Sequence, residues 1–88
     1  MNKSILVTGH TGYIGSILTQ RLQSTNNVIL FDGDVTKVSD WESNLSTDIG
    51  IIYHLAAVEN TDADIISDWK INSEAMLQLC KACKSKNI

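Results

Sequence analysis

The stretch Ile5–Gly15, with the sequence Ile-Leu-Val-Thr-Gly-His-Thr-Gly-Tyr-Ile-Gly, decides the fold of this 88-residue chain. A short apolar run ends in three glycines, Gly9, Gly12 and Gly15, which are spaced three residues apart. An amphipathic helical pattern follows at once. Glycines let the backbone turn tightly and approach a ligand, and the free N–H groups of a first helical turn attract an anion. The stretch therefore predicts a strand, a turn and a helix N-terminus that hold a negatively charged diphosphate.

The predicted diphosphate site comprises the three glycines and the backbone of Thr11, Tyr13 and Ile14. The alternative is an ordinary strand-to-helix turn, because glycine is common in turns. The residues that follow favour the binding site. A second apolar run, Val28 to Phe31, ends at Asp32, which lies 32 − 9 = 23 residues beyond the first glycine.

An acid about 20 residues after the first glycine typically accepts hydrogen bonds from the ribose hydroxyls of a dinucleotide. The carboxylate of Asp32 would repel a 2′-phosphate, so it predicts NAD rather than NADP. The alternative for Asp32 is a solvated strand end.

The size and charge of the chain narrow the class of protein. Eighty-eight residues with a net charge of −3 fit one small domain, 1–88, and argue against a nucleic-acid or membrane surface as the main partner. The N-terminus runs directly into the first strand without a signal peptide, and no apolar stretch approaches the about 20 residues of a membrane span. We therefore expect a cytoplasmic protein.

Apolar periodicity predicts strands that alternate with helices, and hence a parallel sheet with right-handed crossovers. The expected strands cover 4–8, 28–32 and 50–56, and the expected helices cover 13–24, 39–46 and 65–85. The fold class is a truncated, Rossmann-like three-layer α/β sandwich with helices on both faces and strands in the order second, first, third. The dinucleotide should lie at the carboxyl ends of the first and third strands.

Three local patterns refine this expectation. The first helix carries an apolar stripe of Ile14, Ile17, Leu18 and Leu22. The third strand is almost continuously apolar, which is typical of a strand covered on both faces. The long helix carries two apolar stripes, one with Trp69, Met76, Leu79, Cys80 and Cys83 and the other with Ile71 and Ala75. One stripe can cover the sheet, and the other needs a further layer or a second subunit.

The ordered motifs together resemble the extended short-chain dehydrogenase/reductase family, which includes the NAD-dependent sugar-nucleotide epimerases and dehydratases. Thr8–Gly15 is similar to the family's Thr-Gly-x-x-Gly-x-x-Gly loop, and Asp32 matches its ribose-binding acid. Gly33–Thr36 resembles its Gly-Asp-Val-Thr segment, and His54–Ala57 its His-Leu-Ala-Ala strand end. Asn72 matches a helix asparagine of the family. The resemblance covers essentially the whole chain.

The resemblance implies NAD as the cofactor and adds candidate contacts. Asp34 and Val35 would meet the adenine ring, and the groove would be lined by Leu55, Ala56 and Ala57. For each of these residues a purely structural role is the alternative. A sugar nucleotide would be the substrate, bound through further or partner sequence.

The sequence departs from the family in the segment after Asp32. The family places a loop, a helix and a third strand between the acid and the Gly-Asp-Val-Thr segment, whereas Asp32 and Gly33 are adjacent here. The family's edge strand is therefore expected to be short or absent, and one segment would serve both ribose and adenine.

A second departure concerns catalysis. The family's active-site Ser/Thr and its Tyr-x-x-x-Lys pair lie beyond the position of Ile88, and neither Tyr13 nor Tyr53 is followed four residues later by Lys. Hydride transfer to a keto-sugar needs a positioned proton donor. We therefore expect the cofactor-binding part of an epimerase-, dehydratase- or reductase-like protein without catalytic residues in this chain. The alternatives are a stand-alone, non-catalytic nucleotide-binding module and an oligomeric interaction protein that no longer binds cofactor.

No metal site is predicted, and a homodimer is. Cys80 and Cys83 form one Cys-x-x-Cys pair, which is too few ligands for zinc. The acids before the long helix are expected to interact with its dipole; they are Glu59, Asp62, Asp64 and Asp68. The free edge of the last strand and the spare stripe of the long helix predict a homodimer through one or both of them.

Overall fold

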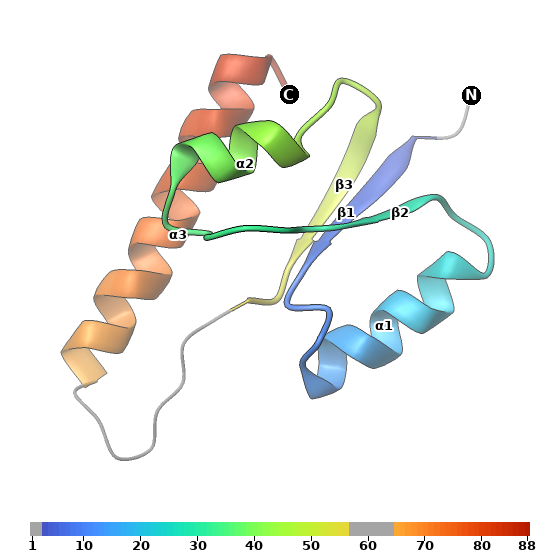
Figure 1. Cartoon of the computed structure of the whole chain (residues 1–88), viewed down its shortest axis with the longest axis horizontal. Helices are drawn as coiled ribbons and strands as arrows, with labels where there is room; N and C mark the ends of the chain where they lie inside the picture. The colour runs from blue at the N-terminus through green and yellow to red at the C-terminus, as the bar shows by residue number, and fades with distance from the viewer. Residues whose placement is uncertain (1–2, 57–64) are drawn as a thin grey trace.

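The computed structural model describes residues 3–56 and 65–88. Three strands alternate with three helices in these residues (Figure 1). Their bounds are β1 Ser4–Thr8, α1 Tyr13–Gln23, β2 Val28–Leu30, α2 Val38–Asn44, β3 Ile49–His54 and α3 Ile65–Lys86. The order is the predicted one, and each boundary lies within two residues of its predicted place.

The three strands form an open parallel sheet in the order β2-β1-β3, as predicted. Ile5 pairs with Val28 on one side and with Ile51 on the other. All five residues of β1 are buried, because this strand has a neighbour on each side and a helix layer on each face. The sheet thus confirms the Rossmann-like fold class.

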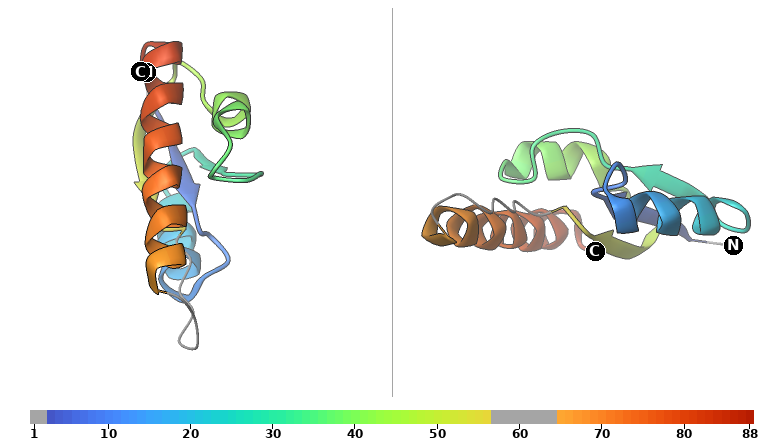
Figure 2. Two further views of the ribbon diagram at one scale, coloured as in Figure 1. Left: turned by 90° about the vertical axis from the view of Figure 1, so that its left-hand side faces the viewer. Right: turned by 90° about the horizontal axis from the view of Figure 1, so that it is seen from below.

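Helices cover both faces of the sheet. In the view of Figure 1, α1 lies on one side of the strands, and α2 and α3 lie together on the other; the view from below in Figure 2 also shows α1 well apart from α2 and α3. The main core forms between the sheet and the α2–α3 pair. Its buried members are Leu6, Phe31, Trp41, Leu45, Ile49, Leu79 and Ala82. Since side chains alternate along a strand, Ile5 and Val7 point to the opposite face, toward α1.

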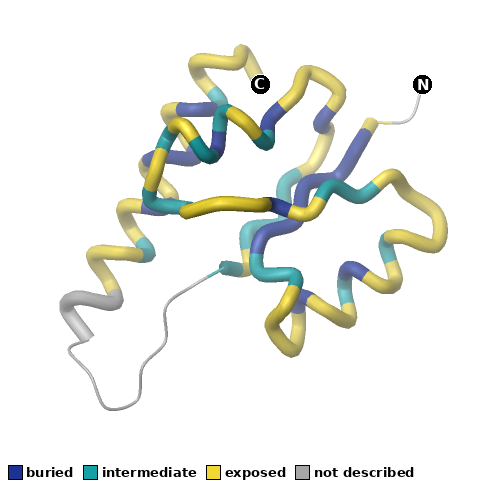
Figure 3. Tube along the Cα trace, in the orientation of Figure 1, coloured by how far each residue is buried: buried dark blue, intermediate teal, exposed yellow. Residues whose placement is uncertain are grey.

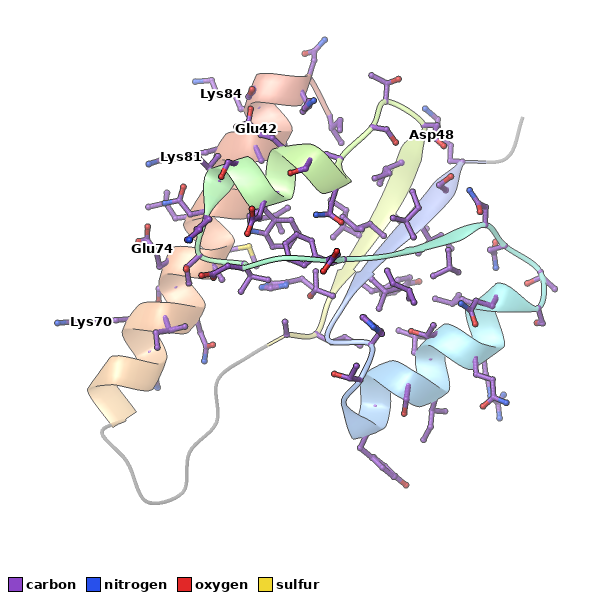
Figure 4. The ribbon with its side chains drawn as sticks, viewed as in Figure 1. Glu42, Asp48, Lys70, Glu74, Lys81 and Lys84 are labelled. Carbon is purple, nitrogen blue, oxygen red and sulfur yellow. The ribbon has the colours of Figure 1, made fainter. Side chains whose placement is uncertain are left out.

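The pair α2–α3 is joined by packing and by a hydrogen bond between side chains. The Ser85 hydroxyl donates a hydrogen bond of 2.9 Å to Glu42 Oε2. Glu42 is labelled on α2 where that helix runs beside α3, whereas Lys70, Lys81 and Lys84 extend away from it (Figure 4). The charged side chains of α3 therefore lie on the outside of the core.

The apolar stripe predicted for α1 is wrong in detail. The helix buries Gly15 and Thr19, whereas Ile14 is 69% exposed and Ile17 is 46% exposed. A glycine and a short hydroxyl side chain let the helix lie close to the sheet, and the larger residues then fall on its flanks. Most of α1 is consequently exposed along its length (Figure 3).

The expectations for β3 and α3 need similar corrections. β3 is not covered on both faces: Ile51 is 48% exposed, because α1 packs mainly over β1 and β2. In α3 the buried positions are Ala75, Gln78, Leu79 and Ala82. Trp69, Met76 and Cys80, placed with Leu79 in one stripe by the sequence, are exposed. None of the helices within residues 3–56 and 65–88 is both long and apolar enough to cross a membrane.

Candidate functional site

Two of the three loop glycines are required by the chain's own backbone. Gly9 has a φ of +74°, and a Cβ there would lie 2.7 Å from the backbone nitrogen of Ala56. A Cβ on Gly15 would lie 1.9 Å from the carbonyl oxygen of Gly9. These glycines let β1, the loop and α1 meet at the end of β3.

Gly12 is different, because nothing in the described chain crowds it. A Cβ on Gly12 would meet only the Gly9 carbonyl oxygen, at an ordinary contact distance of 3.4 Å. Gly12 is also the N-cap of α1 and gives the helix no side-chain cap. The N–H groups of the first helical turn, including those of Tyr13 and Ile14, therefore face a space that the glycine leaves open.

A cleft of about 300 Å³ lies at this helix N-terminus. Its lining residues are Gly9, Gly12, Tyr13, Ile14, Gly15 and Leu55. The structure thus brings the predicted glycine site and Leu55 together, while Thr11 is exposed in the loop beside the cleft. Unpaired N–H groups and a positive helix end suit an anion, so these residues fit the diphosphate of a dinucleotide.

The ends of β1 and β3 are tied by a polar network around Thr8. The Ala56 N–H donates to Thr8 Oγ1 at 3.1 Å, and Thr8 Oγ1 lies 2.7 Å from His54 Nδ1. The Leu55 N–H donates to the Thr8 carbonyl at 3.2 Å. These bonds fix Leu55 and Ala56 beside the glycine loop; Ala57 lies outside the described residues.

His54 is half-buried and serves this network. Burial lowers the pKa of its imidazole, so the neutral ring is favoured. The ring also lies edge-on to Trp41, with the ring centroids 5.4 Å apart. The Thr8 hydroxyl thus accepts from the Ala56 N–H and shares a second hydrogen bond with His54 Nδ1, whose direction is set by the ring tautomer.

Asp32 follows β2 and is exposed. Its backbone is held by the side chain of Asn44, which accepts from the Asp32 N–H at 3.0 Å and donates to the Asp32 carbonyl at 2.9 Å. The Asp32 carboxylate has no hydrogen-bond partner within residues 3–56 and 65–88, so it is free to accept one from a ligand. No pattern in the sequence predicts a role for Asn44.

The turn after Asp32 is built by Gly33 and Asp40. Gly33 has a φ of +138°, and a Cβ there would lie 2.9 Å from the Asp40 side chain. Asp40 Oδ2 accepts from the Asp34 N–H at 2.7 Å. The only sequence signal for Asp40 is an acid in the first turn of a helix, which a helix dipole alone would explain.

The predicted adenine contacts, Asp34 and Val35, lie in this turn. Asp34 Oδ1 accepts from the Thr36 hydroxyl at 2.6 Å and from the Thr36 N–H at 2.9 Å, and these bonds lower the pKa of the Asp34 carboxyl. Val35 is half-buried against the core, and its carbonyl accepts from Trp41 Nε1 at 2.7 Å. The fused segment is therefore an ordered turn.

A larger, mostly apolar groove of about 660 Å³ lies between this turn and α3. Its lining residues are Thr36, Trp69, Lys70, Ile71, Ser73, Glu74 and Leu77. The anion-binding geometry belongs to the smaller cleft, because the free helix N–H groups point there.

The structure adds no metal centre to this site. No group of three or more His, Cys, Asp or Glu side chains that could hold a metal occurs in the part of the chain that the structure describes. Cys80 is exposed and Cys83 is half-buried, and both are free thiols. The acids Glu59, Asp62 and Asp64 lie outside the described residues, as does the side chain of Asp68.

Comparison with known proteins gives one family and several similar structures. The sequence model of the NAD dependent epimerase/dehydratase family matches residues 5–88. No curated protein matches the chain significantly.

UDP-N-acetylglucosamine 4-epimerase from Bacillus cereus is similar, with a TM-score of 0.80 and 24% identity over 99% of this chain. A short-chain dehydrogenase/reductase superfamily protein from Agrobacterium tumefaciens with bound NAD has a TM-score of 0.79 and 19% identity over 97% of the chain. A uronate dehydrogenase variant from the same organism, complexed with NAD, has a TM-score of 0.74 and 17% identity over 99% of the chain. The chain spans 37%, 30% and 38% of these proteins, respectively.

Proposed function

The chain belongs to the NAD dependent epimerase/dehydratase family, and we propose that it is the cofactor-binding part of a sugar-nucleotide epimerase, dehydratase or reductase. NAD is the cofactor that this family assigns to the chain.

The observation that carries the proposal is the contrast among the three glycines. Gly9 and Gly15 are explained by contacts inside the chain, whereas a side chain at Gly12 would meet nothing closer than 3.4 Å. A glycine that no internal contact requires, placed at an uncapped helix N-terminus, is explained by a ligand that approaches the backbone closely. The diphosphate of NAD has the charge and size for this position.

The remaining candidate residues would extend the binding of NAD beyond the cleft at the glycine loop. The glycine loop with Thr11, Tyr13 and Ile14 binds the diphosphate, and the free carboxylate of Asp32 accepts from the ribose hydroxyls. Asp34 and Val35 border the adenine. Leu55 and Ala56 line the wall on the β3 side, and we expect Ala57 to extend it.

NAD supplies a hydride acceptor when it is bound. The proton donor that such a reaction needs is expected outside these 88 residues, because neither tyrosine stands in a Tyr-x-x-x-Lys pattern. The sugar nucleotide would bind to the same further sequence or to a partner. The absence of the pattern equally favours a stand-alone module that holds a nucleotide without catalysis.

Calorimetric titration with NAD⁺, NADP⁺ and ADP-ribose tests the binding proposal. We expect NAD⁺ and ADP-ribose to bind, NADP⁺ to bind more weakly, and Asp32→Ala to weaken the first two. A folded chain that binds none of the three would contradict the proposal and favour an interaction protein without cofactor. Turnover of a sugar nucleotide by the chain alone would contradict the assignment of catalysis to other sequence.

A homodimer and a cytoplasmic location complete the proposal. Support for the dimer comes from the free edge of β3 and from the exposed apolar residues of α3, of which Trp69 is 70% exposed and Met76 is 48% exposed. The cytoplasmic location rests on the sequence alone.

A further inference from the structure

The backbone of Asp32 points away from the sheet. The Asn27 carbonyl and the Phe31 N–H both point toward β1. The Asn27 carbonyl accepts from the Ile5 N–H, and the Phe31 N–H donates to the Val7 carbonyl, each at 2.9 Å. Peptide groups alternate in direction along an extended strand. The N–H and carbonyl of Asp32 therefore point to the outer edge of β2, where no neighbouring strand lies among the described residues.

The side-chain amide of Asn44 meets both of these groups. Asn44 Oδ1 accepts from the Asp32 N–H at 3.0 Å, and Asn44 Nδ2 donates to the Asp32 carbonyl at 2.9 Å. Nδ2 also donates to the Asp40 carbonyl at 2.7 Å. The orientation of the amide follows from this network, because its two carbonyl neighbours need a donor and its N–H neighbour needs an acceptor.

The helix α2 places this amide rigidly. Asn44 is the last residue of α2, and Trp41 and Leu45 on either side of it are 0% and 5% exposed in the core. Asn44 itself is only partly exposed. The amide is thus held at a fixed position beside the end of β2.

We propose that Asn44 is a positioning residue for the cofactor: its amide takes the place of an edge strand beside Asp32 and so aims the Asp32 carboxylate at the ribose. A neighbouring parallel strand would supply one acceptor and one donor at this point, and a side-chain amide carries the same pair. The inference rests on the proposed function, since it assumes that Asp32 binds the ribose. In this proposal Asn44, by orienting Asp32, strengthens the preference of the chain for NAD over NADP.

The test measures the ratio of the Kd for NADP⁺ to the Kd for NAD⁺ in the full chain, with Asn44→Ala as the main variant. We expect the ratio to fall by about tenfold, because a carboxylate that is no longer aimed loses a charge-assisted bond to NAD⁺ and repels the 2′-phosphate less. In an Asp32→Ala background the same substitution should leave the ratio unchanged. Amide hydrogen exchange at Asp32 should be fast in the variant and slow in the wild type.

Asn27→Ala is the matched control. Asn27 Nδ2 donates to Ser4 Oγ at 2.7 Å at the opposite end of the sheet, near the labelled Asp48 (Figure 4). This variant should lose stability without a change in the ratio. If Asn44→Ala does not fold, Asn44→Leu keeps the branched shape of the side chain and raises helix propensity, and it carries the same expectation.

The outcomes separate the two proposals. NAD⁺ binding with an unchanged ratio in the Asn44 variants, or an additive effect in the Asp32→Ala background, overturns the role of Asn44 and leaves the proposed function standing. A folded wild-type chain that binds neither dinucleotide overturns the proposed function, and the role of Asn44 with it.

Discussion

At the scale of single residues, Gly12 and Gly15 are glycines for different reasons. Gly15→Ala would place a methyl group 1.9 Å from the Gly9 carbonyl oxygen, so the free energy of unfolding should fall by about 1–3 kcal/mol. Gly12→Ala should change it by less than about 0.5 kcal/mol, because its Cβ meets only an ordinary contact. Denaturant unfolding of both variants measures the difference.

Substitutions of Gly12 and Gly15 also distinguish an effect on NAD⁺ binding from an effect on stability. Gly12→Ala should lower the affinity for NAD⁺ by at least about tenfold, because its methyl group would occupy the space of the diphosphate. A Gly12→Ala protein that binds NAD⁺ as tightly as the wild type would show that the ligand does not approach the loop.

Thr19 gives a second prediction at this scale. Its Oγ1 is buried against the sheet and is the one such side-chain atom without a hydrogen-bond partner among the described residues. Thr19→Val keeps the shape and removes the unsatisfied hydroxyl, so it should raise the free energy of unfolding by about 1 kcal/mol. Thr47→Val, at an exposed position, is the control and should have little effect. A loss of stability in Thr19→Val would mean that the hydroxyl has a partner in solution.

The grouping of the three loop glycines could be predicted from the sequence, because strand-to-helix turns of this kind repeat the same glycine spacing. Gly9, Gly12, Gly15 and Leu55 indeed line one cleft. The role of Asp32 stays a prediction. The role of Asn44 could not be predicted, because its partners are the backbone N–H and carbonyl of Asp32. Nearly every residue carries these two groups, so the sequence does not indicate which of them a side chain will meet. Only the folded chain brings the two together.

At the scale of elements, the order and type of every helix and strand could be predicted from apolar periodicity. The buried faces could not be predicted equally well. In α1 the sequence favours the large side chains, yet Gly15 and Thr19 face the sheet, because close approach needs small residues at the contact. In β3 an apolar run is compatible with either an inner or an edge strand, and the open sheet leaves it at the edge.

The packing of α2 on the core depends on Trp41, which is fully buried. Its Nε1 donates to the Val35 carbonyl, and its ring centroid lies 4.5 Å from that of Phe31. Trp41→Phe leaves that carbonyl unsatisfied and a gap in the core, so the free energy of unfolding should fall by about 1–3 kcal/mol. Trp69→Phe is the matched control, because Trp69 is 70% exposed, and it should change stability by less than about 0.5 kcal/mol. Urea unfolding followed by circular dichroism compares the two; equal losses would contradict the place of Trp41 in the core.

His54, at the C-terminal end of β3, should make the free energy of unfolding depend on pH. Burial lowers the pKa of His54 below its unfolded value of 6.5, so the unfolded chain takes up the proton first. The contribution of neutral His54 to stability is therefore present above that unfolded value and is lost as the pH falls toward the folded pKa. The free energy of unfolding should decrease over this window, and His54→Gln should flatten the decrease. His10→Gln, which keeps His54, should retain it; an unchanged slope in His54→Gln would assign the effect to other groups.

At the scale of the whole molecule, the chain is more open than a closed domain of its length. Its radius of gyration is 13.5 Å, against about 12 Å expected for 88 residues. The extents of 45 × 30 × 15 Å describe a thin layer with α3 along one side. Two features of that side lack cover among the described residues: the outer edge of β3 and the outward face of α3.

These uncovered surfaces lead to the last prediction, a dimer in solution at tens of micromolar. Met76→Glu places a charge on the outward face of α3, where Met76 is 48% exposed, so it should shift the dimer toward monomer. Ile17→Glu is the matched control, because Ile17 is 46% exposed on α1, on the opposite side of the sheet, and it should leave the dimer intact. Light scattering across a concentration series measures both. A monomeric wild type would refute the dimer, and equal dissociation by both variants would move the interface away from α3.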